Sequence, residues 1–313
     1  MPQSLVPQSL VIDTDTASDD AVALLLAARD PRSRIRAVTV VAGNVPLVQG
    51  VRNAKVTLEL AGAADVPVWA GCSAPLVRDL GTAQNVHGSD GMSGTSLPEP
   101  RMATQDGHAV LALHAIARDE PGQHTLVTLG PLTNIAAAVT IDPGFLTRFR
   151  HTYMMLGTSD GNGNVSAIAE YNAWADPEAA QVVLRAPGEK TMVGWDISRK
   201  YAVIDPAEDR RLRDLGRLGR FAADINRDVH AFAVEETGLA GYDLPDPIAM
   251  AIAIDPSMIV SAEDLHLQVS TDPVTRGHTY ADRRTPPRPV NTRVVMSADG
   301  QVFLDALRAA VTL

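Results

Sequence analysis

The chain has 313 residues, 45% of them hydrophobic, and a formal net charge of −10. The acidic balance argues against nucleic acid or an anionic membrane surface as a partner, because both favour a basic face. Apolar runs are too short to cross a bilayer, the single Cys72 excludes an intramolecular disulfide, and residues 1–10 lack the pattern of a secretory signal. We therefore expect a globular, cytoplasmic protein.

Segments with strand and helix patterns alternate along most of the chain. Apolar runs typical of buried strands lie at residues 10–13, 35–43, 66–71, 125–130, 152–157 and 191–195, and helical patterns at 21–30, 51–62, 108–120, 133–143 and 177–188. Strands joined by helices of this length pair in parallel through right-handed crossovers. A charged helical pattern follows at 205–240, and hairpin-like strands at 265–295. We expect one α/β domain over residues 1–313, with a mostly parallel, Rossmann-like central sheet flanked by helices.

Four carboxylates follow the first predicted strand, in the sequence LVIDTDTASDD. If the strand continues to residue 15, Asp13 and Asp15 project from the same face, while Asp19 and Asp20 lie in the first turn of the next helix. The helix dipole alone favours acids at such a turn. Four converging carboxylates repel one another, however, and no lysine is near them in sequence. A hard divalent cation, Ca²⁺ or Mg²⁺, is the simplest way to offset this repulsion.

A fifth acid, Asp246, lies between two prolines ahead of a helical apolar run. This pattern is typical of a helix start, but the same carboxylate could supply a further cation ligand. Asn44 follows another predicted strand, and His87 lies in a glycine-rich loop, where a histidine usually has no special function. Because ligands bind at the carboxyl ends of strands in open α/β sheets, we expect Asn44 near the acids.

A second polar group lies in the stretch GNGNVSAIAEYNAWADPEAA. Asn164, Glu170 and Asn172 offer donors and acceptors together, which suits the several hydroxyls of a sugar. The alternative is a solvated loop, with Asp176 as the cap of the helix that follows.

Six motifs between residues 10 and 256 share their order with one known family: DTDTASDDAVALLLA, VTVVAGN, HGSDGM, TLGPLTNIA, NVSAIAEYNAWADPEAA and DPIAMAIAIDP. Together they resemble the nucleoside hydrolases, Ca²⁺-dependent N-glycosidases of purine and pyrimidine ribonucleosides. The resemblance implies hydrolysis of the N-glycosidic bond to ribose and free base, a role in purine or pyrimidine salvage, and a homodimer or homotetramer.

The same resemblance implies roles for individual residues. The Ca²⁺ ligands would be Asp15, Asp20, Asp246 and the main-chain carbonyl of Leu129. Asp15 would also take a proton from the metal-bound water, with Asp13 supporting the site. The substrate-binding residues would be Asp19, Asn44, His87, Asn164, Glu170 and Asn172.

The chain departs from the family pattern at two places. Thr16 and Ala17 replace the usual Pro-Gly of the first motif, so the turn before the helix can differ. Pro245 stands where many members have a histidine that protonates the departing base, and proline has no proton to give. The candidates for its replacement are Trp174 and Tyr242 as stacking partners, and His87, His230 or Asp243 as proton donors.

Three alternatives remain open from the sequence. A haloacid-dehalogenase-like phosphatase would use Asp13 as nucleophile with Mg²⁺, but it needs a lysine at a later strand end, which Lys190 and Lys200 fit poorly. A non-catalytic nucleoside-binding protein would keep the cation and the sugar site. A hydrolase of a modified or non-nucleoside riboside would fit the proline at position 245.

Overall fold

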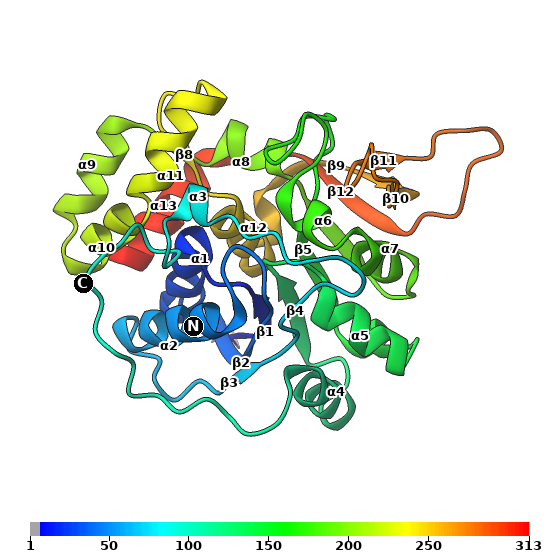
Figure 1. Ribbon diagram of the computed structural model, residues 1–313, viewed down its shortest axis with the longest axis horizontal. Helices are drawn as coiled ribbons and strands as arrows, with labels where there is room; N and C mark the ends of the chain where they lie inside the picture. The colour runs from blue at the N-terminus through cyan, green and yellow to red at the C-terminus, as the bar shows by residue number, and fades with distance from the viewer. Residues whose placement is uncertain (1–6, 313) are drawn as a thin grey trace, which may run out of the picture.

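An eight-stranded sheet forms the centre of the computed structural model, which describes residues 7–312 (Figure 1). Its strands are β1 (Gln8–Thr14), β2 (Ser33–Val40), β3 (Val68–Ala70), β4 (His124–Thr128), β5 (His151–Met155), β6 (Lys190–Val193), β9 (Ile259–Leu265) and β12 (Thr292–Ala298). They lie in the order β3-β2-β1-β4-β5-β6-β12-β9, and only β9 and β12 pair antiparallel. The mostly parallel α/β sheet is therefore confirmed. Residues 1–6, part of the segment considered for a secretory signal, lie outside the described range.

Helices cover both faces of this sheet (Figure 1). One apolar core involves α1 (Ser18–Arg29), α2 (Leu47–Leu60), α8 (Trp195–Tyr201), α10 (Arg217–Ile225), α12 (Pro245–Ile254) and α13 (Gly300–Val311). The second involves α4 (Ala109–Asp119), α5 (Thr133–Ile141) and α7 (Pro177–Arg185). Strand β1 contributes side chains to both cores, because successive side chains of a strand point to opposite faces of the sheet. Leu10 and Ile12 belong to the first core and Val11 to the second.

Smaller elements complete the described chain. The helical pattern at 205–240 forms α9 (Pro206–Asp214), α10, α11 (Arg227–Phe232) and a π-helical turn, Ala233–Thr237. Strand β10 (Leu267–Val269) pairs antiparallel with β11 (Thr279–Ala281), as the hairpin pattern predicts. Strands β7 (Val203–Ile204) and β8 (Tyr242–Asp243) form a separate pair, and α3 (Gln84–His87) and α6 (Tyr171–Ala175) are short helices. No helix in residues 7–312 is long and apolar enough to cross a membrane.

The loops after β1, β2 and β4 meet at the carboxyl edge of the sheet. The N–H of Val41 donates to the carbonyl of Thr14 at 3.0 Å, and the N–H of Leu129 donates to the carbonyl of Asp13 at 2.8 Å. These bonds continue the sheet just beyond its strands, so the polar residues that follow each strand are brought to one place.

Candidate active site

Three carboxylates gather where α1 and α12 begin. Asp19 and Asp20 lie in the first turn of α1, and Asp246 lies in the first turn of α12. Each offers one oxygen, and these oxygens lie within 4.8 Å of one another. Within residues 7–312 no other group of three side chains of metal-ligating type is this close. All three are buried, which makes their mutual repulsion strong.

Asp15 lies beside this group, one residue beyond the end of β1. Its Oδ2 accepts a hydrogen bond from the N–H of Asn44 at 2.6 Å, while its Oδ1 has no partner among the described residues. A Cβ on Gly43 would lie 2.1 Å from Oδ2, and one on Gly130 would lie 2.7 Å from Oδ1. The carboxylate is therefore held between two backbones that approach closely because both residues are glycine.

Burial raises the pKa of every carboxyl group in this region. Burial, and then the charge of Asp19, raise the pKa of Asp20 to about 6, and burial raises that of Asp19 to about 6. Burial followed by the charge of Asp20 holds the pKa of Asp15 and of Asp246 well above the usual range. For Asp13 burial raises the pKa to about 7. Without a cation, the cluster therefore holds protons near neutral pH.

Several buried oxygens here have no hydrogen-bond partner among the described residues. They are Asp15 Oδ1, Asp19 Oδ1 and Asn172 Oδ1, with Asp13 Oδ2 close by in sequence. A buried acceptor without a partner costs free energy, and native proteins contain few of them. Carboxylate, amide and carbonyl oxygens are the ligands of hard divalent cations. The residues present therefore fit a divalent cation.

A cavity of about 350 Å³ reaches this cluster at Asp246, the one of its carboxylates that belongs to the lining among the described residues. Nine of the residues singled out from the sequence line it: Asn44, His87, Leu129, Asn164, Glu170, Asn172, Trp174, Pro245 and Asp246. Sequence reasoning missed Thr82, Asn85, Val86, Met155 and Phe232, which also line it. The wall near the acids is polar, whereas Val86, Trp174, Phe232 and Pro245 make another part of the lining apolar.

The predicted sugar-binding residues are fixed by main-chain hydrogen bonds. Glu170 is the N-cap of α6, and its two oxygens accept from three main-chain N–H groups at 2.7 to 3.1 Å. Asn164 Oδ1 accepts from the N–H of Tyr171 at 2.8 Å, and Asn172 Nδ2 donates to the carbonyl of Leu129 at 2.6 Å. The Asn172 oxygen thus stays available as an acceptor.

His87, at the end of α3, contacts the first turn of α1. Its Nδ1 lies 2.9 Å from Ser18 Oγ and 3.8 Å from Asp19 Oδ1. Burial lowers the pKa of His87 to about 4, although the charge of Asp20 acts in the opposite direction. The imidazole is therefore neutral at neutral pH.

Of the two predicted stacking residues, only Trp174 lines the cavity. Arg276 packs over one face of its ring: the guanidinium carbon lies 3.8 Å from the ring centroid, and Nε donates to the Trp174 carbonyl at 2.7 Å. Tyr242 is 1% exposed, belongs to the apolar core, and its hydroxyl points to Asp209 at 3.5 Å.

The other two proton-donor candidates do not line the cavity either. The His230 ring packs against the Tyr242 ring with centroids 5.5 Å apart. Asp243 accepts a hydrogen bond from Ser198 Oγ at 2.6 Å. Neither Tyr242 nor Asp243 lines the cavity, although both closely precede Pro245 in sequence; Asp243 is still near enough for its charge to help raise the pKa of Asp19.

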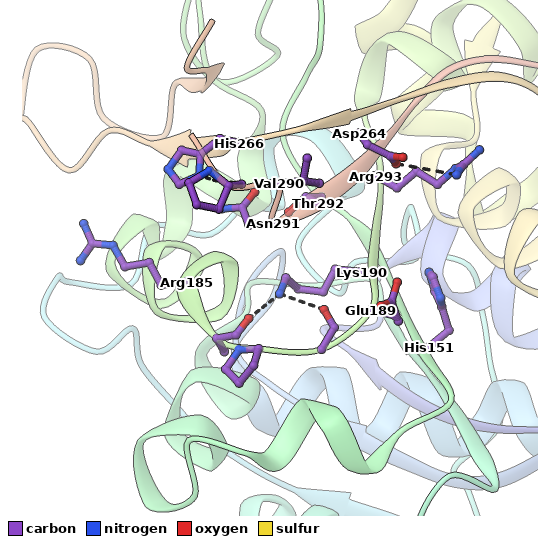
Figure 2. A pocket seen from close by; sticks show the side chains of 14 residues that line it. His151, Arg185, Glu189, Lys190, Asp264, His266, Val290, Asn291, Thr292 and Arg293 are labelled. Atoms are coloured by element: carbon purple, nitrogen blue, oxygen red, sulfur yellow. Dashed lines mark hydrogen bonds and ion pairs between the residues drawn. The ribbon is translucent and has the colours of Figure 1, made fainter. Parts of the chain in front are cut away.

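A larger cavity, of about 640 Å³, lies where β5, β6 and β12 begin, and it does not contain the acids (Figure 2). Lys190 lies here, at the amino end of β6, and its Nζ donates to the carbonyls of Ala186 at 2.5 Å and Gly188 at 3.2 Å (Figure 2). Lys200 is half-exposed and pairs with Asp160 and Asp196. Neither lysine lines the cavity beside the acids: Lys190 lies at the amino end of its strand, and Lys200 is paired with acids of the segments that follow β5 and β6.

Comparisons with known proteins agree with this site. A family model described as inosine-uridine preferring nucleoside hydrolase matches residues 10–305. The chain is 36% identical over 311 residues to the inosine-uridine preferring nucleoside hydrolase of Leishmania major, covering 96% of this chain and 98% of that protein. It is 33% identical over 302 residues to a pyrimidine-specific ribonucleoside hydrolase of Klebsiella pneumoniae, covering 95% and 96%.

The fold gives the same result. The purine-preferring ribonucleoside hydrolase from Gardnerella vaginalis superposes with a TM-score of 0.90 at 30% identity, over 97% of this chain and 98% of that one. The chain therefore belongs to the inosine-uridine preferring nucleoside hydrolase family, and it is an enzyme that hydrolyses ribonucleosides to ribose and free base.

Proposed function

We propose that the enzyme hydrolyses the N-glycosidic bond with bound Ca²⁺ and with Asp15 as the general base. The observation that carries this proposal is a group of buried carboxylates with unpartnered oxygens beside a cavity that is polar near the acids and apolar elsewhere. A ribonucleoside has the same division, with a hydroxyl-rich sugar joined to a flat base.

The Ca²⁺ ligands in this proposal are Asp15, Asp20, Asp246 and the carbonyl of Leu129. The donor set consists of oxygen alone, as Ca²⁺ prefers. When bound, Ca²⁺ supplies positive charge that orients sugar hydroxyls and lowers the pKa of water. Leu129 supports this role because, among residues 7–312, its carbonyl accepts one hydrogen bond, from Asn172, and keeps a lone pair.

Asp15 Oδ1 accepts the proton of the attacking water in this scheme. Its neighbour Oδ2 is fixed by the N–H of Asn44, so the free oxygen has one orientation. Asp19, Asn164, Glu170 and Asn172 hold the ribose. Cleavage of the bond passes through a sugar that resembles an oxocarbenium ion, and the surrounding carboxylates stabilise its positive charge.

The base side of the site depends on stacking in this proposal. Pro245 lines the cavity and cannot protonate a leaving group, and Trp174 and Phe232 provide aromatic surface there. The names of the relatives include inosine-uridine, pyrimidine and purine preferences, so they do not select one base. Pro245 also supports a second candidate substrate class, modified or non-nucleoside ribosides whose leaving group departs without a proton.

A reducing-sugar assay over purine and pyrimidine ribonucleosides tests the proposal, with Ca²⁺ and again after chelation. Ribose release that chelation abolishes and Ca²⁺ restores is the expected result. Release that persists after complete chelation would refute the role of the cation. If no common ribonucleoside reacts but a riboside with an acidic leaving group does, such as p-nitrophenyl riboside, the second substrate class is favoured. Assembly as a homodimer or homotetramer, which light scattering can measure, and a cytoplasmic location stay predictions.

A further inference from the structure

Two threonines next to the carboxylate cluster form a hydrogen-bonded chain that ends on Asp20. Thr14 Oγ1 donates to Asp20 Oδ1 at 2.5 Å, and the N–H of Ala17 donates to Asp20 Oδ2 at 2.9 Å. Thr16 contacts the same Thr14 oxygen twice, through its N–H at 3.1 Å and through its own Oγ1 at 3.0 Å. All four residues have no exposed surface, so water does not replace these bonds.

The protons in this chain can have only one arrangement when Asp20 is ionised. A hydroxyl has one proton and two lone pairs. The Thr14 proton goes to Asp20, so in the contact between the two hydroxyls Thr16 is the donor. Thr14 then accepts two hydrogen bonds, from the N–H and the O–H of Thr16, and donates one. Hydrogen bonds in such a chain polarise and strengthen one another.

Thr16 itself is fixed to the neighbouring helix. Asn53, a buried residue of α2, donates from Nδ2 to the carbonyl of Thr16 at 3.0 Å. A proline at position 16, the usual family residue, has neither the N–H nor the hydroxyl that reach Thr14. In this chain, therefore, the Thr14 hydroxyl that donates to Asp20 accepts hydrogen bonds from two donors of Thr16, which the Pro-Gly form of the motif cannot provide.

We infer that Thr16 is a positioning residue, which directs the Thr14 hydroxyl at Asp20 and holds that carboxylate ready to bind the cation. This inference rests on the proposed Ca²⁺ site, in which Asp20 is a ligand. Thr16 acts through Thr14: in the described part of the chain its hydroxyl and N–H bond to Thr14 and not to Asp20. Its loss leaves one lone pair of Thr14 without a donor and lets the carboxylate reorient.

Calorimetric titration of the full, chelator-treated protein with CaCl₂ tests this inference. Thr16→Ala removes the hydroxyl and should raise the Kd for Ca²⁺ about tenfold, the factor expected for one net hydrogen bond. Thr16→Ser keeps the hydroxyl and should stay within about twofold of the wild type. Thr57→Ala is the matched control, because Thr57 is buried on α2 and its hydroxyl has no partner among the described residues. If Thr16→Ala does not fold, Thr16→Val keeps the branched shape.

The outcomes separate the two proposals. A wild-type protein that binds no Ca²⁺ overturns the proposed metal site itself. A wild-type protein that binds Ca²⁺, with the same Kd in Thr16→Ala, overturns only the role of Thr16. A purely structural role would lower the melting temperature of the Ca²⁺-free protein and leave the Kd unchanged, which also contradicts the inference. Equal weakening in Thr16→Ala and Thr16→Ser would show that the hydroxyl is not the cause.

Discussion

Replacing Gly43 by alanine would bring a methyl group against the carboxylate of Asp15. The new Cβ would lie 2.1 Å from Asp15 Oδ2 and 2.8 Å from its Cγ, with Pro131 Cδ also at 2.8 Å. Real Cβ contacts are essentially never below 3.0 Å, so one of these groups must move. A displacement of roughly 1 Å at a reacting group can cost about 100-fold in rate, and it would also break the 2.6 Å hydrogen bond from Asn44.

We therefore expect Gly43→Ala to lower kcat for ribose release by at least about 100-fold at saturating substrate and Ca²⁺. Gly144→Ala is the control, since a Cβ there would lie no closer than 3.3 Å to a neighbouring atom, an oxygen of Asp142. Circular dichroism and the melting temperature establish that both variants are folded. A folded Gly43→Ala enzyme with more than a third of wild-type kcat would refute the argument that Asp15 must stay between the two glycines.

Four further predictions concern the same site. Asp15→Asn should keep the fold and lower kcat by about 10²–10⁴-fold, and full activity would exclude Asp15 as the base. Asp19→Ala should raise KM about tenfold with a smaller change in kcat, and an unchanged KM would remove Asp19 from the sugar site. Pro245→His should raise kcat/KM for ribonucleosides with poor leaving groups by at least about tenfold but not for p-nitrophenyl riboside, and an equal effect on both would contradict proton donation. In the Ca²⁺-free protein, burial raises the pKa of Asp13 from 3.8 and that of Glu170 from 4.5, in both cases to about 7. Between the ordinary and the raised pKa values the folded state therefore holds more protons than the unfolded state. The free energy of unfolding consequently falls as the pH rises through this window. Without Ca²⁺ the melting temperature should therefore be lower at pH 7.5 than at pH 5.5, and the stabilisation by Ca²⁺ should be larger at pH 7.5; a Ca²⁺-free protein that is more stable at the higher pH would contradict this.

The parallel sheet could be predicted because its strands are buried on both faces. Such strands are continuous apolar runs, and the helices between them have a clear period, so β1, β2 and β4 to β6 stand out. Strand β9 gives no comparable signal. It is the last strand of the sheet, and most of its residues are partly or fully exposed, so few of its side chains need be apolar. The order of the strands depends on pairing between distant segments and is not contained in any local pattern.

The acids could be predicted for a different reason. Asp13 is the penultimate residue of β1, and Asp15, Asp19 and Asp20 follow within six residues of its end, so the strand end alone brings these acids close together. Phe232 could not be found in this way, because the end of α11 reaches the cavity only through the packing of several helices. Tyr242 is the opposite case, a residue predicted to contact the base that does not line the cavity.

Tyr242 lies three residues before Pro245, and this position suggested a place in the active site. The pairing of β8 with β7 instead turns its ring into the core, and its hydroxyl points to Asp209. Nearness in sequence predicts a shared orientation only within one regular element, and here Tyr242 belongs to a strand and Pro245 to the helix that follows it.

The wall of the cavity that carries Trp174 is held by a part of the chain 102 residues downstream. Arg276, between β10 and β11, covers the indole ring, and Gly277 lets the loop approach so closely that a Cβ there would lie 2.5 Å from the Trp174 Cα. Substitutions in the loop between these strands can therefore shift the indole without replacing any acid or amide of the sugar site. If Trp174 stacks on the base as proposed, a library confined to that loop would alter which bases the enzyme accepts, so the hairpin is a place from which new substrate ranges can be selected.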